Sequence, residues 1–165
     1  MTQQGASVER EHHWPPTLYM MVGLPGSGKT TRAKALEADD SALRLTPDEW
    51  IVALYGDDLD RPHRDAVRDP VEAVQWQVAK RALSLGCNVV LDWGFWSQAE
   101  RAEYRRQAEA SGASVRVIFL DVCTDELWAR ISQRDESAEG TLGITLWELE
   151  QWSSMFEPPT DEELS

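Results

Sequence analysis

Residues 23–30 read GLPGSGKT, which satisfies the pattern GxxxxGK[ST] at every fixed position. An apolar run at 18–22 reads as a buried strand in front of it, and a helix is expected from about residue 28 to residue 37. In this context glycines let backbone N–H groups turn toward an anion, and the helix N-terminus adds a partial positive charge. The motif therefore predicts a nucleotide phosphate site in which Lys29 reaches the β- and γ-phosphates and Thr30 binds Mg²⁺. The residues expected to contact the nucleotide, ATP, are Gly23, Leu24, Pro25, Gly26, Ser27, Gly28, Lys29, Thr30 and Thr31.

Length and composition indicate one globular domain. A chain of 165 residues with 42% hydrophobic and 27% charged side chains can bury a sizeable core. Residues 1–16 are polar, lack periodicity and end in two prolines, so we expect a loosely held tail and a domain over 17–165. Cys87 and Cys123 belong to no metal-binding or CxxC spacing, and we expect them to be buried free thiols in a reducing compartment.

Charge and hydropathy restrict the partners. Twenty-nine acidic and sixteen basic side chains give a formal net charge of -13, which disfavours a long nucleic acid as ligand. A local basic cleft can still accept a short anion such as ATP. No run of 18 apolar residues and no signal-like segment is evident, so we expect a cytoplasmic protein without a membrane association.

Strand-like and helix-like segments alternate after the motif. Further strands are expected at 42–45, 88–92 and 115–120. Helices are expected after Thr46, from about 71 to 85 with Asp69 and Pro70 as the start signal, from 97 to 110, after Thr124 as the cap, and from Thr145 toward Phe156. Capping boxes are predicted where Ser or Thr precedes Glu by three residues, at Thr46 with Glu49, Ser97 with Glu100 and Thr145 with Glu148. The charged segment 56–68 is expected to be a loop or a flap.

This alternation predicts the fold class. About four strands in a short, mostly parallel sheet with helices on both faces make a three-layer α/β/α fold of the P-loop NTPase type, with a helical lid. An acidic group at a neighbouring strand end is expected to support the Mg²⁺. Asp92 and Asp121 both end apolar runs, and we favour Asp92 because the aromatic stretch after it suggests a pocket floor. Either aspartate could instead cap the turn after its strand.

The sequence resembles the AAA-type predicted kinases. This group of P-loop kinases includes the kinase domain of phage polynucleotide kinase, chloramphenicol phosphotransferase and zeta toxins. The residues that carry the likeness are GLPGSGKT at 23–30, TPDEW at 46–50, VVLD at 89–92 and ELWARISQR at 126–134. The likeness spans nearly the whole chain from Thr17. It implies an ATP-dependent, Mg²⁺-using phosphotransferase.

The resemblance also implies catalytic roles beside that of Lys29. Asp48, in the first turn of a helix that follows a strand, matches the aspartate that acts as general base toward the attacking hydroxyl. The alternative is a helix-capping role alone, since an acidic residue there favours the helix dipole. Arg130 and Arg134 lie four residues apart on one helix face and align with lid arginines that clamp the phosphates. Their alternative is a salt-bridged surface.

The acceptor is expected to be a hydroxyl on a small molecule. The chain lacks the phosphatase domain of the polynucleotide kinase, is strongly acidic and carries eight tryptophans. Four aromatic residues flank the predicted catalytic strand ends, as pocket walls or as core: Trp50, Trp93, Phe95 and Trp96. A polynucleotide 5′-hydroxyl kinase is the second hypothesis. A nucleotide-binding switch or ATPase is the third.

Overall fold

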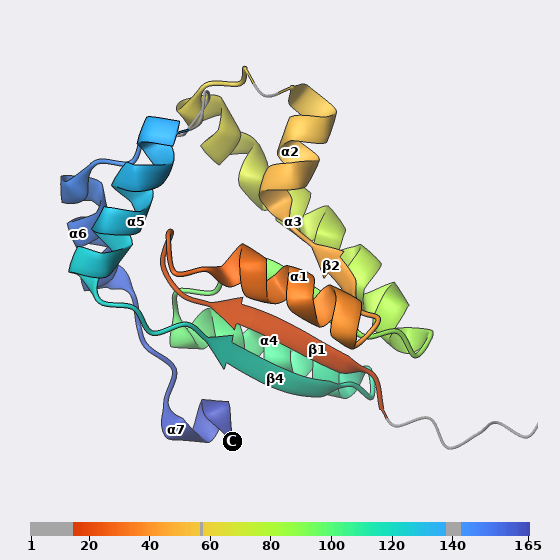
Figure 1. The fold of residues 1–165 in the computed structure, drawn as a ribbon. Helices are drawn as coiled ribbons and strands as arrows, with labels where there is room; N and C mark the ends of the chain where they lie inside the picture. The colour runs from red at the N-terminus through yellow and green to blue at the C-terminus, as the bar shows by residue number, and fades with distance from the viewer. Residues whose placement is uncertain (1–14, 57, 138–142) are drawn as a thin grey trace, which may run out of the picture.

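The computed structural model describes residues 15–56, 58–137 and 143–165. Four parallel strands form its sheet in the order β2-β3-β1-β4, as Figure 1 shows in part. The strands are β1 Thr17–Val22, β2 Leu43–Leu45, β3 Val89–Gly94 and β4 Ser114–Phe119. The predicted parallel sheet is confirmed, and its two longest pairings place β1 in the middle beside β3 and β4.

Helices connect the strands and extend beyond them. Their bounds are α1 Lys29–Asp39, α2 Pro47–Tyr55, α3 Arg61–Ser84, α4 Gln98–Ala110, α5 Thr124–Ser137, α6 Leu146–Met155 and α7 Asp161–Leu164. Among the described residues, none of these helices combines the length and the apolar character that crossing a bilayer requires.

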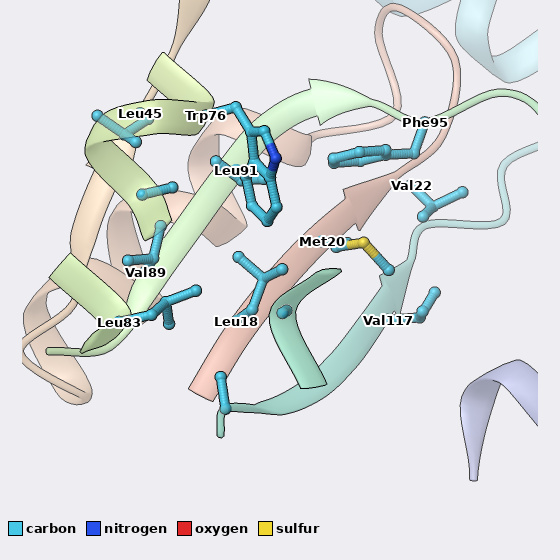
Figure 2. Close-up of a cluster of buried hydrophobic side chains, with 13 residues drawn as sticks. Leu18, Met20, Val22, Leu45, Trp76, Leu83, Val89, Leu91, Phe95 and Val117 are labelled. Atoms are coloured by element: carbon cyan, nitrogen blue, oxygen red, sulfur yellow. The ribbon is translucent and has the colours of Figure 1, made fainter. Parts of the chain in front are cut away.

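The side chains of β1 alternate between two cores, as period-2 geometry demands. Leu18, Met20 and Val22 pack with α3 and α4 side chains, including Trp76 and Leu83, on one face of the sheet (Figure 2). Tyr19 and Met21 pack with Ala33 and Leu36 of α1 on the other face. The two cores make the fold three-layered, as the alternating sequence predicts.

The predicted loop at 56–68 is wrong over most of its length. Helix α3 begins at Arg61, continues through Pro70 and ends at Ser84. Its N-cap is Asp60, whose carboxylate accepts the backbone N–H of His63 at 3.0 Å, and Pro62 lies in the first turn, where a missing N–H costs nothing. The sequence repeats this acid-proline pattern at Asp69 and Pro70, and the second copy was mistaken for the helix start.

The three predicted capping boxes have different outcomes. Thr145 and Glu148 form theirs reciprocally, and Ser97 accepts the Glu100 N–H at 3.1 Å. The box at Thr46 does not form, because the guanidinium of Arg44 binds both partners, Thr46 Oγ1 and, at 2.9 Å, Glu49 Oε1.

Further expectations also fail. Thr124 is the first residue of α5 rather than its cap, and its hydroxyl lies 3.2 Å from that of Ser153. Both cysteines are free but exposed, not buried, since Cys87 lies in the turn after α3 and Cys123 in the connection to α5. The tail predicted for 1–16 lies outside the described residues except for Pro15 and Pro16.

The apolar residues of β3 are expected to contribute strongly to stability. Leu91 is fully buried in this strand, which pairs on both sides. Leu91→Ala should lower the free energy of unfolding by about 2–5 kcal/mol, measured by urea denaturation. The control is Leu54→Ala, whose residue is 64% exposed. A change of similar size in both variants would contradict the assignment of Leu91 to the core.

Candidate nucleotide and acceptor site

A large open pocket lies beside the carboxyl ends of the strands. Its volume is about 810 Å³, which is within the range of small-molecule sites. Six of the sixteen lysines and arginines of the chain line it, although the protein as a whole is strongly acidic. These six are Lys29, Arg61, Arg64, Arg68, Arg130 and Arg134. Five acidic residues also line it, namely Asp48, Asp65, Glu72, Asp92 and Glu100. The pocket therefore gathers cations without being uniformly basic, in contrast to the acidic excess of the whole chain.

The GLPGSGKT segment turns from β1 into α1 through backbone conformations that favour glycine. Gly23, Gly26 and Gly28 have φ values of +150°, +83° and +95°. A Cβ at Gly23 would lie 2.8 Å from Ser27 Oγ, and one at Gly26 would lie 3.0 Å from Ile131 Cγ1, whereas one at Gly28 would meet nothing within 4 Å. The first two glycines thus allow close packing behind the loop. Gly28 faces open space, as an anion cradle needs.

The predicted nucleotide-contact residues divide into two sets. Six line the pocket and three lie behind it: Pro25, Gly26, Gly28, Lys29, Thr30 and Thr31 in the pocket, and Gly23, Leu24 and Ser27 behind. Gly23 N donates to Gly94 O at 3.1 Å, and Leu24 packs among Leu127, Ile131 and Leu149 of α5 and α6. The buried set therefore fastens the loop to β3 and to the helices of the expected lid.

Lys29 is held close to the loop. Its Nζ donates to Leu24 O at 2.9 Å. Burial lowers the pKa of Lys29 to about 8, against the opposing effect of Asp92 and Asp48, while Arg68 and Arg134 lower it further. An ammonium group that has lost hydration and lies among other cations gains strongly from an anionic ligand.

Asp92 lies in the pocket and is 6% exposed. The pairing of β1 with β3 shifts between Met20 and Val22, where Asp92 and Trp93 oppose a single residue. Such a bulge re-aims side chains. Burial raises the pKa of Asp92, while a hydrogen bond from the Thr30 side chain and the charge of Lys29 lower it.

Among the residues that the structure describes, none hydrogen-bonds to the second carboxylate oxygen of Asp92, which suits an oxygen ligand for a divalent cation. Asp121 is exposed and does not line the pocket. The structure therefore brings Asp92, and not Asp121, to Thr30.

Asp48 enters the same pocket from the first turn of α2. Its carboxylate is 59% exposed and forms an ion pair with Arg68 of α3. Arg68 also contacts Glu72 at 3.4 Å. A partly exposed carboxylate that faces the phosphate loop and is held by an arginine from another helix can reach a ligand.

Arg130 and Arg134 line the pocket from α5, as their spacing predicts. Arg130 pairs with Glu126 at 2.5 Å and lies 3.4 Å from the carbonyl oxygens of Gly26 and Ser27. The salt bridge that was the alternative interpretation therefore exists. The salt bridge with Glu126 coexists with the contact to the loop, because the Arg130 side chain, which is 44% exposed, reaches both Glu126 and the loop carbonyls.

The rest of the pocket is made by α3 and by the end of β3. One face of α3, spaced at three to four residues, contributes Arg61, Arg64, Asp65, Arg68 and Glu72. Three aromatic residues from the end of β3 and the turn after it also line the pocket, and we call them the aromatic wall: Trp93, Phe95 and Trp96. Trp50 is not part of the pocket and packs against the core.

Two carboxyl groups that line the pocket with the aromatic wall have raised pKa values. Burial raises the pKa of Glu72 to about 7, although Arg68 lowers it, and burial also raises the pKa of Glu100. Both residues line the pocket. This part of the site therefore offers hydrogen-bonding carboxyl groups beside apolar rings, which is how sites for small polar ligands are commonly built.

Several lining residues were missed from the sequence. Glu72, Glu100, Ile144 and Trp152 had no assigned role, and Arg61, Arg64 and Arg68 were placed in a loop. The signal for the arginines was present as helical spacing after Asp60. Trp152 and Ile144 come from the C-terminal part of the chain and could be found only from the packing of α6.

The succession of strand, glycine loop and helix defines a P-loop nucleotide-binding domain. Lys29 and Thr30 of this loop and helix open into the pocket that the arginines line. A family model described as an AAA domain matches residues 18–159, so the chain belongs to this AAA domain family. No curated protein matches the chain.

Solved structures show the same fold. A presumed kinase from Chloroflexus aurantiacus j-10-fl is 20% identical, with a TM-score of 0.72 over 90% of this chain and 84% of the other. A protein of the Pnkp1/Rnl/Hen1 RNA repair complex is 22% identical, with a TM-score of 0.70 over 91% of this chain, which spans only 46% of that protein. A gluconokinase from Sinorhizobium meliloti 1021 is 17% identical, with a TM-score of 0.59 over 92% of this chain and 80% of the other. These likenesses support a kinase-like P-loop fold.

Nucleotide affinity is expected to fall as pH rises. Free Lys29 has a pKa of about 8, and bound phosphates would raise it, so binding takes up a proton above that pH. The Kd of a non-hydrolysable ATP analogue should rise roughly tenfold from about pH 7 to about pH 9, as measured by calorimetry. Lys29→Arg stays charged and should remove this dependence. The same pH profile in that variant would rule out Lys29 as its source.

Proposed function

We propose that this protein is an ATP-dependent phosphotransferase that moves the γ-phosphate of ATP to a hydroxyl group of a small molecule. The observation that carries the proposal is the position of Asp48. Its carboxylate opens into the pocket that Lys29, Thr30 and Asp92 share, and it comes from a separate helix. A carboxylate there can accept the proton of an attacking hydroxyl, and the pocket of about 810 Å³ leaves room beside it for an acceptor larger than water.

ATP and Mg²⁺ fit the residues present. Gly28 leaves open space at the N-terminus of α1, and Lys29 is a desolvated cation beside it. The Thr30 hydroxyl and the second carboxylate oxygen of Asp92 would hold Mg²⁺, which supplies charge neutralisation on the phosphates. Arg130 and Arg134 would contact the phosphates from α5.

The proposed reaction uses Asp48 as general base. Its carboxylate would accept the proton of the acceptor hydroxyl while that oxygen bonds to the γ-phosphorus and ADP leaves with the electrons of the broken bond. Arg68 would hold the carboxylate in place at the pocket, because the two groups form an ion pair. The acceptor would lie between Asp48 and the aromatic wall.

A polynucleotide 5′-hydroxyl kinase is the second candidate. The three arginines of the α3 face and the likeness to a protein of an RNA repair complex favour it. The net charge of -13 and the carboxyl groups beside the aromatic wall favour a small acceptor. The gluconokinase likeness is also in line with a small hydroxyl compound.

The acceptor class can be tested with labelled ATP and a panel of alcohols. The panel contains gluconate and other sugars, nucleosides, sugar nucleotides, hydroxyl-bearing antibiotics and 5′-hydroxyl oligonucleotides. We expect transfer to a small molecule and none by Lys29→Ala. Transfer to oligonucleotides alone, with a KM that rises steeply with salt, would replace the first candidate by the second. Hydrolysis or binding without any transfer would contradict both and favour a nucleotide switch.

Replacing the proposed base should separate chemistry from nucleotide binding. Asp48→Asn should lower kcat by roughly two to four orders of magnitude, because the amide cannot accept the proton. The Kd for ATP should stay within about twofold, since Asp48 binds neither phosphate nor metal in the proposal. Glu49→Gln, one residue along on the same turn, is the matched control. Unchanged turnover in Asp48→Asn would remove the general-base assignment.

A further inference from the structure

Arg101 is a charged residue almost wholly buried beneath the aromatic wall. It lies in the first turn of α4 and is 1% exposed. Its Nη1 donates to Phe95 O at 3.1 Å and to Glu157 O at 2.9 Å, while Nε and Nη2 donate to the Glu163 carboxylate at 2.7 and 3.2 Å. One guanidinium therefore connects the end of β3 with the C-terminal segment. A buried cation in this position needs its counter-ion.

Phe95 adopts a backbone conformation that a bulky side chain rarely takes. Its φ is +47°, in the left-handed region. The ring points into the core beside Val22 (Figure 2) and stacks on Trp93 with centroids 5.6 Å apart. Such a conformation persists only where neighbouring groups hold it. The Arg101 guanidinium is one such group, because it donates a hydrogen bond to the Phe95 carbonyl. Trp96 follows this turn directly, and Trp93, which lies in β3 and donates to Gln75 Oε1 at 2.9 Å, contacts the turn through its stacking on the Phe95 ring.

The C-terminal segment contacts the same turn a second time. Glu157 N donates to Trp96 O at 2.9 Å, and the Glu157 carboxylate accepts Gln98 N at 2.6 Å. Glu163 lies in α7, where it also caps Thr160 N at 3.0 Å. Residues 160–165 lie beyond the part of the chain that the AAA domain model matches, 18–159. The counter-ion of Arg101 therefore comes from outside the matched domain.

We propose that Arg101 and Glu163 are positioning residues for the acceptor: their ion pair holds the Phe95 turn and thereby fixes the aromatic wall of the pocket. Neither residue lines the pocket, so both act through Phe95 and Trp96. The residues expected to contact the phosphates come from other elements, the loop at 23–30 and α5, whereas Asp92 and the Gly94 carbonyl that binds the loop lie on β3, before the Phe95 turn. This proposal rests on the proposed function in one respect only, which is that the ligand bound at the aromatic wall is the phosphate acceptor.

The arrangement of the wall can be measured without any substrate. Protein labelled with 5-fluorotryptophan gives ¹⁹F resonances, and Trp93→Phe, Trp96→Phe and Trp147→Phe assign the three that matter. In Glu163→Gln and in Arg101→Lys we expect the Trp93 and Trp96 resonances to shift or broaden. The Trp147 resonance should stay unchanged, since that residue is 67% exposed on α6. Glu162→Gln, an exposed neighbour in α7, is the control and should change none of them.

Unchanged Trp93 and Trp96 resonances in both folded variants would overturn the proposal, and so would equal changes at all three tryptophans. Because this readout needs no turnover, it stands or falls separately from the kinase assignment.

Once an acceptor is found, kinetics give the second readout. Glu163→Gln should raise the KM for the acceptor about fivefold or more, with kcat and the KM for ATP within about twofold. If Glu163 had a merely structural role, its replacement would reduce the fraction of active protein, so kcat would fall while the KM for the acceptor stayed the same. A fall in kcat with an unchanged acceptor KM would contradict the positioning role, even where the tryptophan resonances move.

Discussion

The turn after β1 has to leave the sheet, reverse its direction and enter α1 within six residues, 23–28. Three glycines at positive φ make this possible, and the bond from Gly23 N to Gly94 O ties the turn to β3. A side chain at Gly26 would collide with Ile131 of α5. The same loop that leaves space for an anion at Gly28 is therefore the surface on which α5 rests. Arg130 and Arg134 reach the pocket because of this close contact.

The pocket also depends on how charge is distributed over the molecule. Most acidic side chains lie elsewhere, while six cations gather around the space beside the loop. Lys29 illustrates the result, because desolvation and neighbouring arginines weaken its hold on its proton while Asp92 and Asp48 strengthen it. We propose that this distribution favours a compact anion over a polyanion, since the net charge of -13 opposes the approach of a long polyanion.

Much of this arrangement was accessible from the sequence, for identifiable reasons. The motif at 23–30 and the apolar runs are local patterns, so the strands, the parallel sheet and the entry of Lys29 and Thr30 into one site followed directly. Asp48 and Asp92 were placed by their positions after strands. Helix α3 was truncated because Pro70 resembled a helix start, and Asp60 was not recognised as the cap. The failed cap at Thr46 reflects competition from Arg44, a tertiary partner that no local pattern reveals.

Other features depended on long-range pairing. The bulge that turns Asp92 toward Thr30 arises from the register between β1 and β3. The ion pair of Arg61 with Glu148, 87 residues apart, connects α3 with α6, and the Arg61 guanidinium lies 5.4 Å from the centre of the Trp152 ring at the edge of the pocket. The burial of Arg101 could not be anticipated either, because its counter-ion is 62 residues away. Hydrophobic periodicity shows which face of a helix or strand is buried. It does not show which residues of different helices and strands contact each other, and so it cannot predict these contacts.

The two exposed cysteines lie at informative places in this scaffold. Cys87 precedes the amino end of β3, and Cys123 follows the carboxyl end of β4, next to the start of α5. They are the only two cysteines in the chain. A pair of spectroscopic probes attached to them would have one member in the turn before β3 and the other at the start of the helix that carries Arg130 and Arg134. The natural sequence thus allows the distance between that helix and the far end of the sheet to be measured without any introduced residue.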